Sequence, residues 1–238
     1  MHLPRKERGL VNSAVLPAIA VLLLWCAYWL DVVFDLEFYR LGIFPRIAKG
    51  LSGVVAAPFI HGDLDHLLNN SIPLFVLGWG LMYFFPRLAG RVLIGSWLVS
   101  GLCVWVSARS SYHIGASGVV YGLAAFLFTS GILRRQRTLM GLALLVVFLY
   151  GGLLWGMFPI FPHISWESHF WGGAAGVIMA FIYRHVPSAV NDPRPIVWDD
   201  EEDEPNDDKA LHPMTNDEDE HGTRTWRSTD TWNIGPPK

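Results

Sequence analysis

Two small-residue segments of this 238-residue sequence each contain one side chain that could take part in nucleophilic catalysis. GASGVVYG, at 115–122, contains Ser117, and SHFWGGAAGV, at 168–177, contains His169. A serine hydroxyl becomes an effective nucleophile when an imidazole lies within hydrogen-bond distance and takes its proton. A neutral imidazole suits that role because its reference pKa is about 6.5. The two residues are therefore a candidate Ser–His pair, although either one alone could be only a helix cap or a packed histidine.

A third segment, HGDLDHLLNN at 61–70, contains groups that could stabilise negative charge. His66 and Asn70 are four residues apart, so they share one face of a helix. A side-chain N–H aimed at the oxyanion of a tetrahedral intermediate would stabilise it, as would the unsatisfied backbone N–H groups at a helix N-terminus. His61 lies just over one turn earlier, near the preceding loop. Asp65 is expected to act as the N-cap of the helix.

Regularly spaced glycines indicate how the two catalytic segments could meet. Each candidate residue is followed by two glycines four residues apart, Gly118 and Gly122 after Ser117, and Gly172 and Gly176 after His169. Small residues at this spacing let membrane helices approach closely. If the glycine faces pack together, the hydroxyl and the imidazole come together at one end of the helix pair. Ala180 is expected to face lipid instead.

The segments that must position these residues are apolar enough to cross a lipid bilayer. Six apolar segments lie at about 14–30, 67–85, 92–107, 117–133, 139–158 and 169–184. A transmembrane helix needs about 20 residues, with the shorter segments extended by their flanks. No Asp or Glu occurs between Asp65 and Glu167, whereas a soluble helical protein of that length would need charged outer faces. The sequence therefore predicts an all-α polytopic membrane protein, a bundle of six transmembrane helices.

Basic residues predict the orientation of this bundle. They gather before the first segment, between the second and third, between the fourth and fifth, and after the sixth: Arg5, Lys6, Arg8, Arg87, Arg91, Arg134, Arg135, Arg137 and Arg184. Six spans would place all of them on one side, which the positive-inside rule makes cytoplasmic. Both termini, including the short N-terminal segment 1–13, are then expected in the cytoplasm, and the candidate catalytic residues near the outer face.

The C-terminal part of the chain differs sharply in composition from the rest. Residues 187–238 contain 14 of the 21 acidic residues but only 5 of the 18 basic ones. High charge and few aliphatic residues are typical of disorder. We therefore expect a catalytic membrane domain over 14–186, followed by a disordered acidic cytoplasmic tail over 187–238.

Taken together, the three motifs resemble those of the rhomboid family of intramembrane serine proteases. That family carries a His-and-Asn pair on its second helix, Gly-x-Ser-Gly at the start of its fourth and His-x-x-Gly-x-x-x-Gly on its sixth. HGDLDHLLNN, GASG and HFWGGAAG match these motifs in spacing and order. One difference lies in the first loop, where many members carry a Trp-Arg pair and this chain reads GIFPRIAKGLSGVVAAPFIHG.

The resemblance implies a role for each matching residue. Ser117 would be the nucleophile and His169 the general base, with Tyr121 stacked on the imidazole and Gly115 part of the serine motif. Transmembrane protein substrates would be cleaved near the outer face, in what is expected to be a bacterial inner membrane. No cofactor, metal or nucleic-acid partner is expected. A dyad is inferred because Glu167, two residues from His169, would point elsewhere on the helix.

Two alternatives belong to other functional classes. His61, His66 and His169 could hold zinc in a membrane metallohydrolase, because three histidines are a sufficient ligand set. Sensitivity to chelators would distinguish that enzyme from a serine protease. A non-catalytic relative that binds membrane proteins is the second alternative. Such relatives lack the serine or the histidine, and both are present here.

Overall fold

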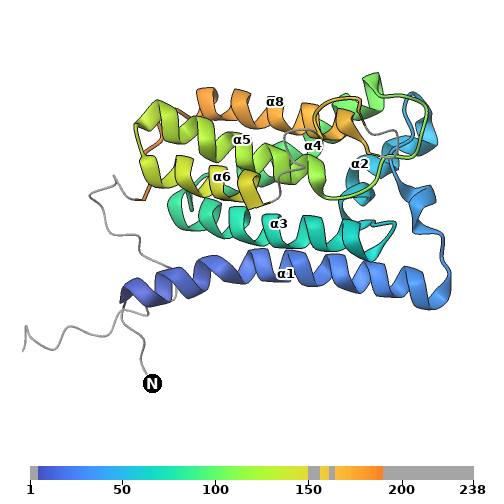
Figure 1. Cartoon of the computed structure of the whole chain (residues 1–238), viewed down its shortest axis with the longest axis horizontal. Coiled ribbons are helices and arrows are strands. Elements are labelled where there is room, and N and C mark those ends of the chain that lie inside the picture. Colours follow the sequence, from blue (N-terminus) through green and yellow to red (C-terminus); the bar gives the residue numbers. More distant parts are fainter. Residues whose placement is uncertain (1–4, 150–155, 161–163, 190–238) are drawn as a thin grey trace, which may run out of the picture. The chain divides into compact units, whose positions relative to one another are not determined.

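The computed structural model describes residues 5–149, 156–160 and 164–189 (Figure 1). Its α-helices are α1 (Arg5–Phe34), α2 (Gly53–Ala56), α3 (Leu64–Phe84), α4 (Ala89–Ser107), α5 (Ser117–Arg134), α6 (Arg137–Leu149) and α8 (Trp166–Ile182), with 3-10 helices at Phe38–Leu41, Ala48–Ser52 and Ala57–Phe59. The described residues contain no strand, only a single β-bridge between Ile43 and His113. Contacts divide the chain into Met1–Pro195 and Ile196–Lys238, and every described residue belongs to the first unit.

The prediction of an all-α membrane protein is confirmed. Four described helices are long and apolar enough to cross a bilayer: Gly9–Phe34, Leu64–Phe84, Ala89–Ser107 and Ser117–Arg134. The helix α8 has 17 residues, and α6 is described over 13. Large apolar side chains cover the outer surface, as a lipid-facing surface requires.

The fifth apolar segment ends earlier than its composition predicts. Its apolar residues predict a span that reaches residue 158, but residues 156–160 form turns, and 150–155 lie outside the described residues. Pro159 explains part of the difference, because the residue before a proline is disfavoured in the helical region. Gly156 lies in a turn, so its backbone carbonyl can accept a hydrogen bond from a side chain elsewhere in the bundle.

The helix α5 lies at the centre of the bundle. It packs most extensively against α8 and also contacts α3, α4 and α6, while α1 packs along α3 (Figure 1). Its side chains Leu123, Phe126 and Leu127 are fully buried in the main hydrophobic core. The helices α3, α5 and α8 all begin at the same end of the bundle, so their N-terminal residues share one region (Figure 1).

The cap of α3 differs from the expected one. Asp63, rather than Asp65, is the N-cap, and its carboxylate accepts the backbone N–H of His66 at 2.7 Å. Asp63 has the extended backbone that an N-cap needs, whereas Asp65 already lies in the first helical turn. The cap fixes the start of the helix that carries His66 and Asn70.

Residues 187–189, the first of the predicted tail, pack against the opposite end of the bundle. The backbone N–H of Ala189 donates to the carbonyl of Phe84 at 2.8 Å. Ser188 is fully buried, and its hydroxyl accepts from Gln136 Nε2 at 2.7 Å. The rest of the predicted tail lies outside the described residues.

Candidate active site

The glycine faces of α5 and α8 are in direct backbone contact. A β-carbon added to Gly172 would collide with the carbonyl oxygen of Gly118, and one added to Gly176 would collide with that of Gly122. Only glycine permits this approach, which the spacing of these residues predicted. The expected lipid exposure of Ala180 is wrong, since it is fully buried. It lies one turn after Gly176, so it continues the face that packs inward.

His169 is held in one tautomer by a backbone group. Its Nδ1 lies 2.8 Å from the carbonyl oxygen of Gly156. Because a carbonyl can only accept, Nδ1 must carry the proton of the neutral ring. The other nitrogen, Nε2, is then a proton acceptor. The ring also stacks on Tyr121, with centroids 4.2 Å apart and planes at 9°, so its orientation is fixed as well.

Ser117 is the first residue of α5, and Ala116 is the N-cap. The serine is therefore not serving as the cap that a serine at a helix start often provides. Ser117 and His169 are both largely buried, each 9% exposed. Within the described residues they form no hydrogen bond with each other. Such bonds are often long in unliganded enzymes and shorten when substrate binds.

The loop before Ser117 lies directly against the side chains of α3. Gly115 has φ +102°, and a β-carbon there would lie 2.5 Å from His66 Nε2 and 3.6 Å from Asn70 Nδ2. A glycine is required both by the backbone angle and by the lack of space. Asn70 Nδ2 donates to the carbonyl of His66 at 3.0 Å, which uses one of its two amide hydrogens. The start of α5 thus lies beside an oriented amide.

Comparisons with known proteins identify the family of the chain. The chain matches the Rhomboid domain over residues 48–186, more than half of its length. It belongs to the rhomboid family. The chain is also similar to an uncharacterized protein of Mycobacterium tuberculosis strain H37Rv, 34% identical over 195 residues, covering 75% of this chain and 78% of that protein. A protein of Acanthamoeba polyphaga mimivirus, named as a rhomboid protein, is 26% identical over 137 residues, covering 52% and 71%.

His61 packs against the histidine of the rhomboid motif on α3. Its ring centroid lies 4.9 Å from that of His66, at 64°. The side chain is 3% exposed, and burial lowers the pKa of His61 to about 3, so the ring is neutral near pH 7. Among the described residues, no three His, Cys, Asp or Glu side chains are close enough to hold a metal.

Arg46 attaches the first loop, which lacks the Trp-Arg pair, to the end of α4. Its Nη1 donates to the carbonyl of Ala108 at 2.7 Å, and its backbone N–H donates to that of Trp105 at 2.9 Å. A guanidinium at a helix C-terminus is favourable, since the last carbonyls there lack helical partners. In this rhomboid-family chain, Arg46 connects the first loop to the bundle through these two hydrogen bonds.

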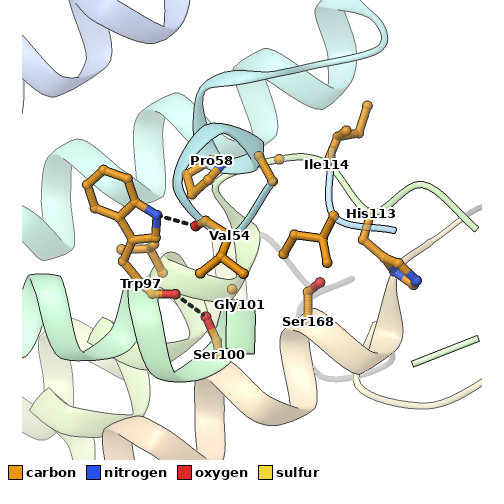
Figure 2. Close-up of a pocket in the computed structure, with 13 residues that line it drawn as sticks. Val54, Pro58, Trp97, Ser100, Gly101, His113, Ile114 and Ser168 are labelled. Atoms are coloured by element: carbon orange, nitrogen blue, oxygen red, sulfur yellow. Dashed lines mark hydrogen bonds between the residues drawn. The ribbon is translucent and has the colours of Figure 1, made fainter. Parts of the chain in front are cut away.

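Figure 2 shows a small cavity beside the loop that leads to α5. Its volume is about 20 Å³, enough for about one water molecule. Residues from the first loop, α4, the loop before α5, α5 and α8 line it: Ile43, Val54, Ala57, Pro58, Trp97, Ser100, Gly101, His113, Ile114, Gly115, Gly118, Val119 and Ser168. Ser117 and His169 are not among these residues, so the cavity adjoins the candidate pair without containing it.

Proposed function

We propose that this rhomboid-family protein is an intramembrane serine endopeptidase that cleaves the transmembrane segments of protein substrates. The observation that carries the proposal is the state of His169. The Gly156 carbonyl holds its Nδ1–H, Tyr121 holds its ring, and its Nε2 is left as a base. The glycine contact between α5 and α8 joins the helix that bears this base to the helix that begins with Ser117.

The reaction begins when Ser117 Oγ attacks the scissile carbonyl carbon and its proton passes to His169 Nε2. The carbonyl oxygen becomes an oxyanion, which accepts hydrogen bonds from the backbone N–H of Ser117, the second amide hydrogen of Asn70 and the ring of His66. Return of the proton to the leaving amine breaks the peptide bond and leaves an acyl ester on Ser117. Water, deprotonated by the same imidazole, then hydrolyses the ester.

No carboxylate is needed as a third member. In serine proteases with a triad, a carboxylate holds the Nδ1–H of the histidine and fixes its tautomer. The Gly156 carbonyl occupies that place here, at 2.8 Å. A neutral carbonyl stabilises the developing imidazolium less than a carboxylate would, but it avoids an unpaired charge within the membrane.

The location of the site follows from the distribution of basic residues. The positive-inside rule places both termini in the cytoplasm and the start of α5 near the outer face. We infer a bacterial inner membrane as the setting, with the acidic tail on the side opposite the chemistry.

The proposal is tested with a fluorophosphonate, which labels only an activated serine, and with a transmembrane test substrate in detergent. The wild-type protein should be labelled on Ser117 and should cleave the substrate. Ser117→Ala and His169→Ala should each abolish both signals while the protein remains folded. A wild-type protein that binds the substrate, but neither cleaves it nor reacts, would instead be the non-catalytic binder. Cleavage that survives in either variant would overturn the dyad.

A further inference from the structure

An ion pair between the partly exposed Arg109 and the buried Glu167 links the loop before α5 to the first turn of α8. The Glu167 side chain is 6% exposed, and its Oε1 lies 3.7 Å from Arg109 Nε. The same oxygen accepts the backbone N–H of Arg109 at 3.3 Å. The guanidinium also donates from Nη2 to the carbonyl of Ile164 at 2.6 Å. Arg109 is therefore attached both to the helix that carries His169 and to the segment that leads into it.

His113 makes a second connection between the same two segments. Its Nε2 lies 3.0 Å from the carbonyl of Arg109, so this nitrogen carries the proton and Nδ1 is an acceptor. The Ser165 hydroxyl must then donate to Nδ1, at 2.6 Å, and Ser168 must donate to Ser165 Oγ, at 2.7 Å. His113 is 2% exposed, and burial lowers its pKa, which keeps this arrangement of protons.

These links lie beyond the point where the helix backbones touch. The contact of Gly172 with Gly118 sets the separation of the helices. This contact does not hold the loop that ends at Ser117 or the first turn of α8, so other groups must hold them. Arg109 and Glu167 hold both, on the side of the glycine contact where the hydroxyl and the imidazole lie.

We propose that Glu167 is a positioning residue of the active site, which clamps the loop before α5 through Arg109 and so fixes where Ser117 sits relative to His169. This inference rests on the proposed protease function for its catalytic readout. Glu167 is not a third member of a triad, because His169 Nδ1 is already held by the Gly156 carbonyl.

The burial of this carboxylate supports a clamping role. A buried charge is unfavourable unless it is paired and hydrogen-bonded. Glu167 is compensated by a guanidinium, by a backbone N–H and by its place in the first turn of α8, where the helix dipole favours an anion. The guanidinium and the backbone N–H both belong to Arg109 and are lost if the loop moves, so the loop and the carboxylate stabilise each other.

The test compares three variants of the full chain in detergent: Glu167→Ala, Glu167→Gln and Asp65→Asn. The alanine removes the acceptor of the Arg109 N–H, and the glutamine keeps an acceptor oxygen. Asp65 is the control, an exposed carboxylate at the same end of the bundle. Glu167→Ala should lower kcat by about 10- to 100-fold with KM changed by less than about threefold, because small displacements of reacting groups have effects of this size. Glu167→Gln should lose less, and Asp65→Asn should match the wild type.

A double-mutant cycle with Arg109→Gln tests whether Arg109 is the residue through which Glu167 acts. If Glu167 acts through Arg109, the double variant Arg109→Gln/Glu167→Ala should be no slower than the slower single variant. Additive losses would overturn the clamp, as would an unchanged kcat in Glu167→Ala. A loss that merely follows a lower unfolding temperature, with KM and kcat affected alike, would also overturn it.

Amide hydrogen exchange tests the clamping role of Glu167 independently of the proposed protease function. Glu167→Ala should accelerate exchange of the backbone amides of 108–116 while those in the interior of α3 stay protected. Exchange could be faster in Glu167→Ala even though the wild-type protein shows no cleavage and no fluorophosphonate labelling. That result would support the clamping role of Glu167 and contradict the protease function. Unchanged exchange together with an unchanged kcat would reject the clamp and leave the protease intact.

Discussion

The two ends of the α5–α8 pair are held together in different ways. Along the first two turns of α5 no side chain separates it from α8, since Gly172 and Gly176 lie against the carbonyls of Gly118 and Gly122. At the other end a long side chain makes the connection. Arg134 Nη2 donates to the carbonyls of Tyr183 at 2.7 Å and Val186 at 3.1 Å, and the guanidinium lies 5.0 Å from the ring centroid of Phe85.

The two kinds of contact should therefore affect different properties, namely the position of the catalytic groups and the stability of the fold. A backbone contact has no rotamers with which to absorb an added atom, so any change there alters the distance between the helices. A flexible side chain can adjust, and its loss weakens the structure without moving the distant end. Variants near the beginning of the two helices should therefore change the rate of cleavage, and variants near Arg134 should change the unfolding temperature.

The largest effect after loss of the nucleophile or base is expected at Asn70. Asn70→Ala removes the proposed N–H donor to charge that exists only in the transition state, so turnover should fall by about 10²–10³-fold, mainly in kcat. Steady-state kinetics with the transmembrane test substrate measure this directly. If only KM rises, Asn70 binds substrate rather than the oxyanion.

The glycine contact should give the next largest effect. Gly172→Ala places a methyl group against the Gly118 carbonyl, and the helices must move apart. A misplacement of about 1 Å can lower a rate by about 10²-fold. The neighbouring variant Gly173→Ala is the matched control, because among the described residues its β-carbon would meet only the methyl group of Met157, at 3.4 Å.

Cleavage rate and unfolding temperature should be measured together for both glycine variants. We expect Gly172→Ala to be slow and Gly173→Ala to be close to wild type. Equal rates in the two would mean that the contact tolerates separation and does not set the geometry of the dyad.

Sequence reasoning identified the contacts that residue type or residue spacing marks in the sequence. The stacking of Tyr121 on His169 followed from the family resemblance, and the packing of Gly118 on Gly172 from small-residue spacing. The catalytic roles of Ser117 and His169 stay predictions. The all-α membrane fold was predictable because a bilayer excludes charge over long stretches of sequence.

The contacts that the sequence analysis missed depend on backbone atoms or on where loops fold back. The acceptor for His169 Nδ1 is the carbonyl of Gly156, and a carbonyl is present at every residue, so no sequence signal marks it. Glu167 was expected to point away from the base, and its partner Arg109 lies 58 residues away in the chain. Pairings at that separation follow from tertiary structure rather than from any local pattern.

Arg134→Met should affect stability but leave the chemistry unchanged. The change removes two charge-assisted hydrogen bonds to the segment after α8, each worth about 1.5–3 kcal/mol at most, while keeping a long apolar side chain. The unfolding temperature in detergent should fall, and kcat below that temperature should stay within about twofold of wild type. A kcat that falls as far as that of Gly172→Ala would show that the two ends are coupled.

The smallest effect is expected from removing the acidic tail, provided that the cut is placed correctly. A chain ending at Arg184 loses the acceptor at Val186, the buried Ser188 and the backbone bond from Ala189 to Phe84. A chain ending at Ala189 keeps all three. Both should retain the wild-type kcat, because the cut lies at the far end of α8 from His169, but only the shorter chain should unfold at a lower temperature. Reduced kcat in the folded chain ending at Ala189 would mean that the tail supports the catalytic end, and that the separation between the two ends is incomplete.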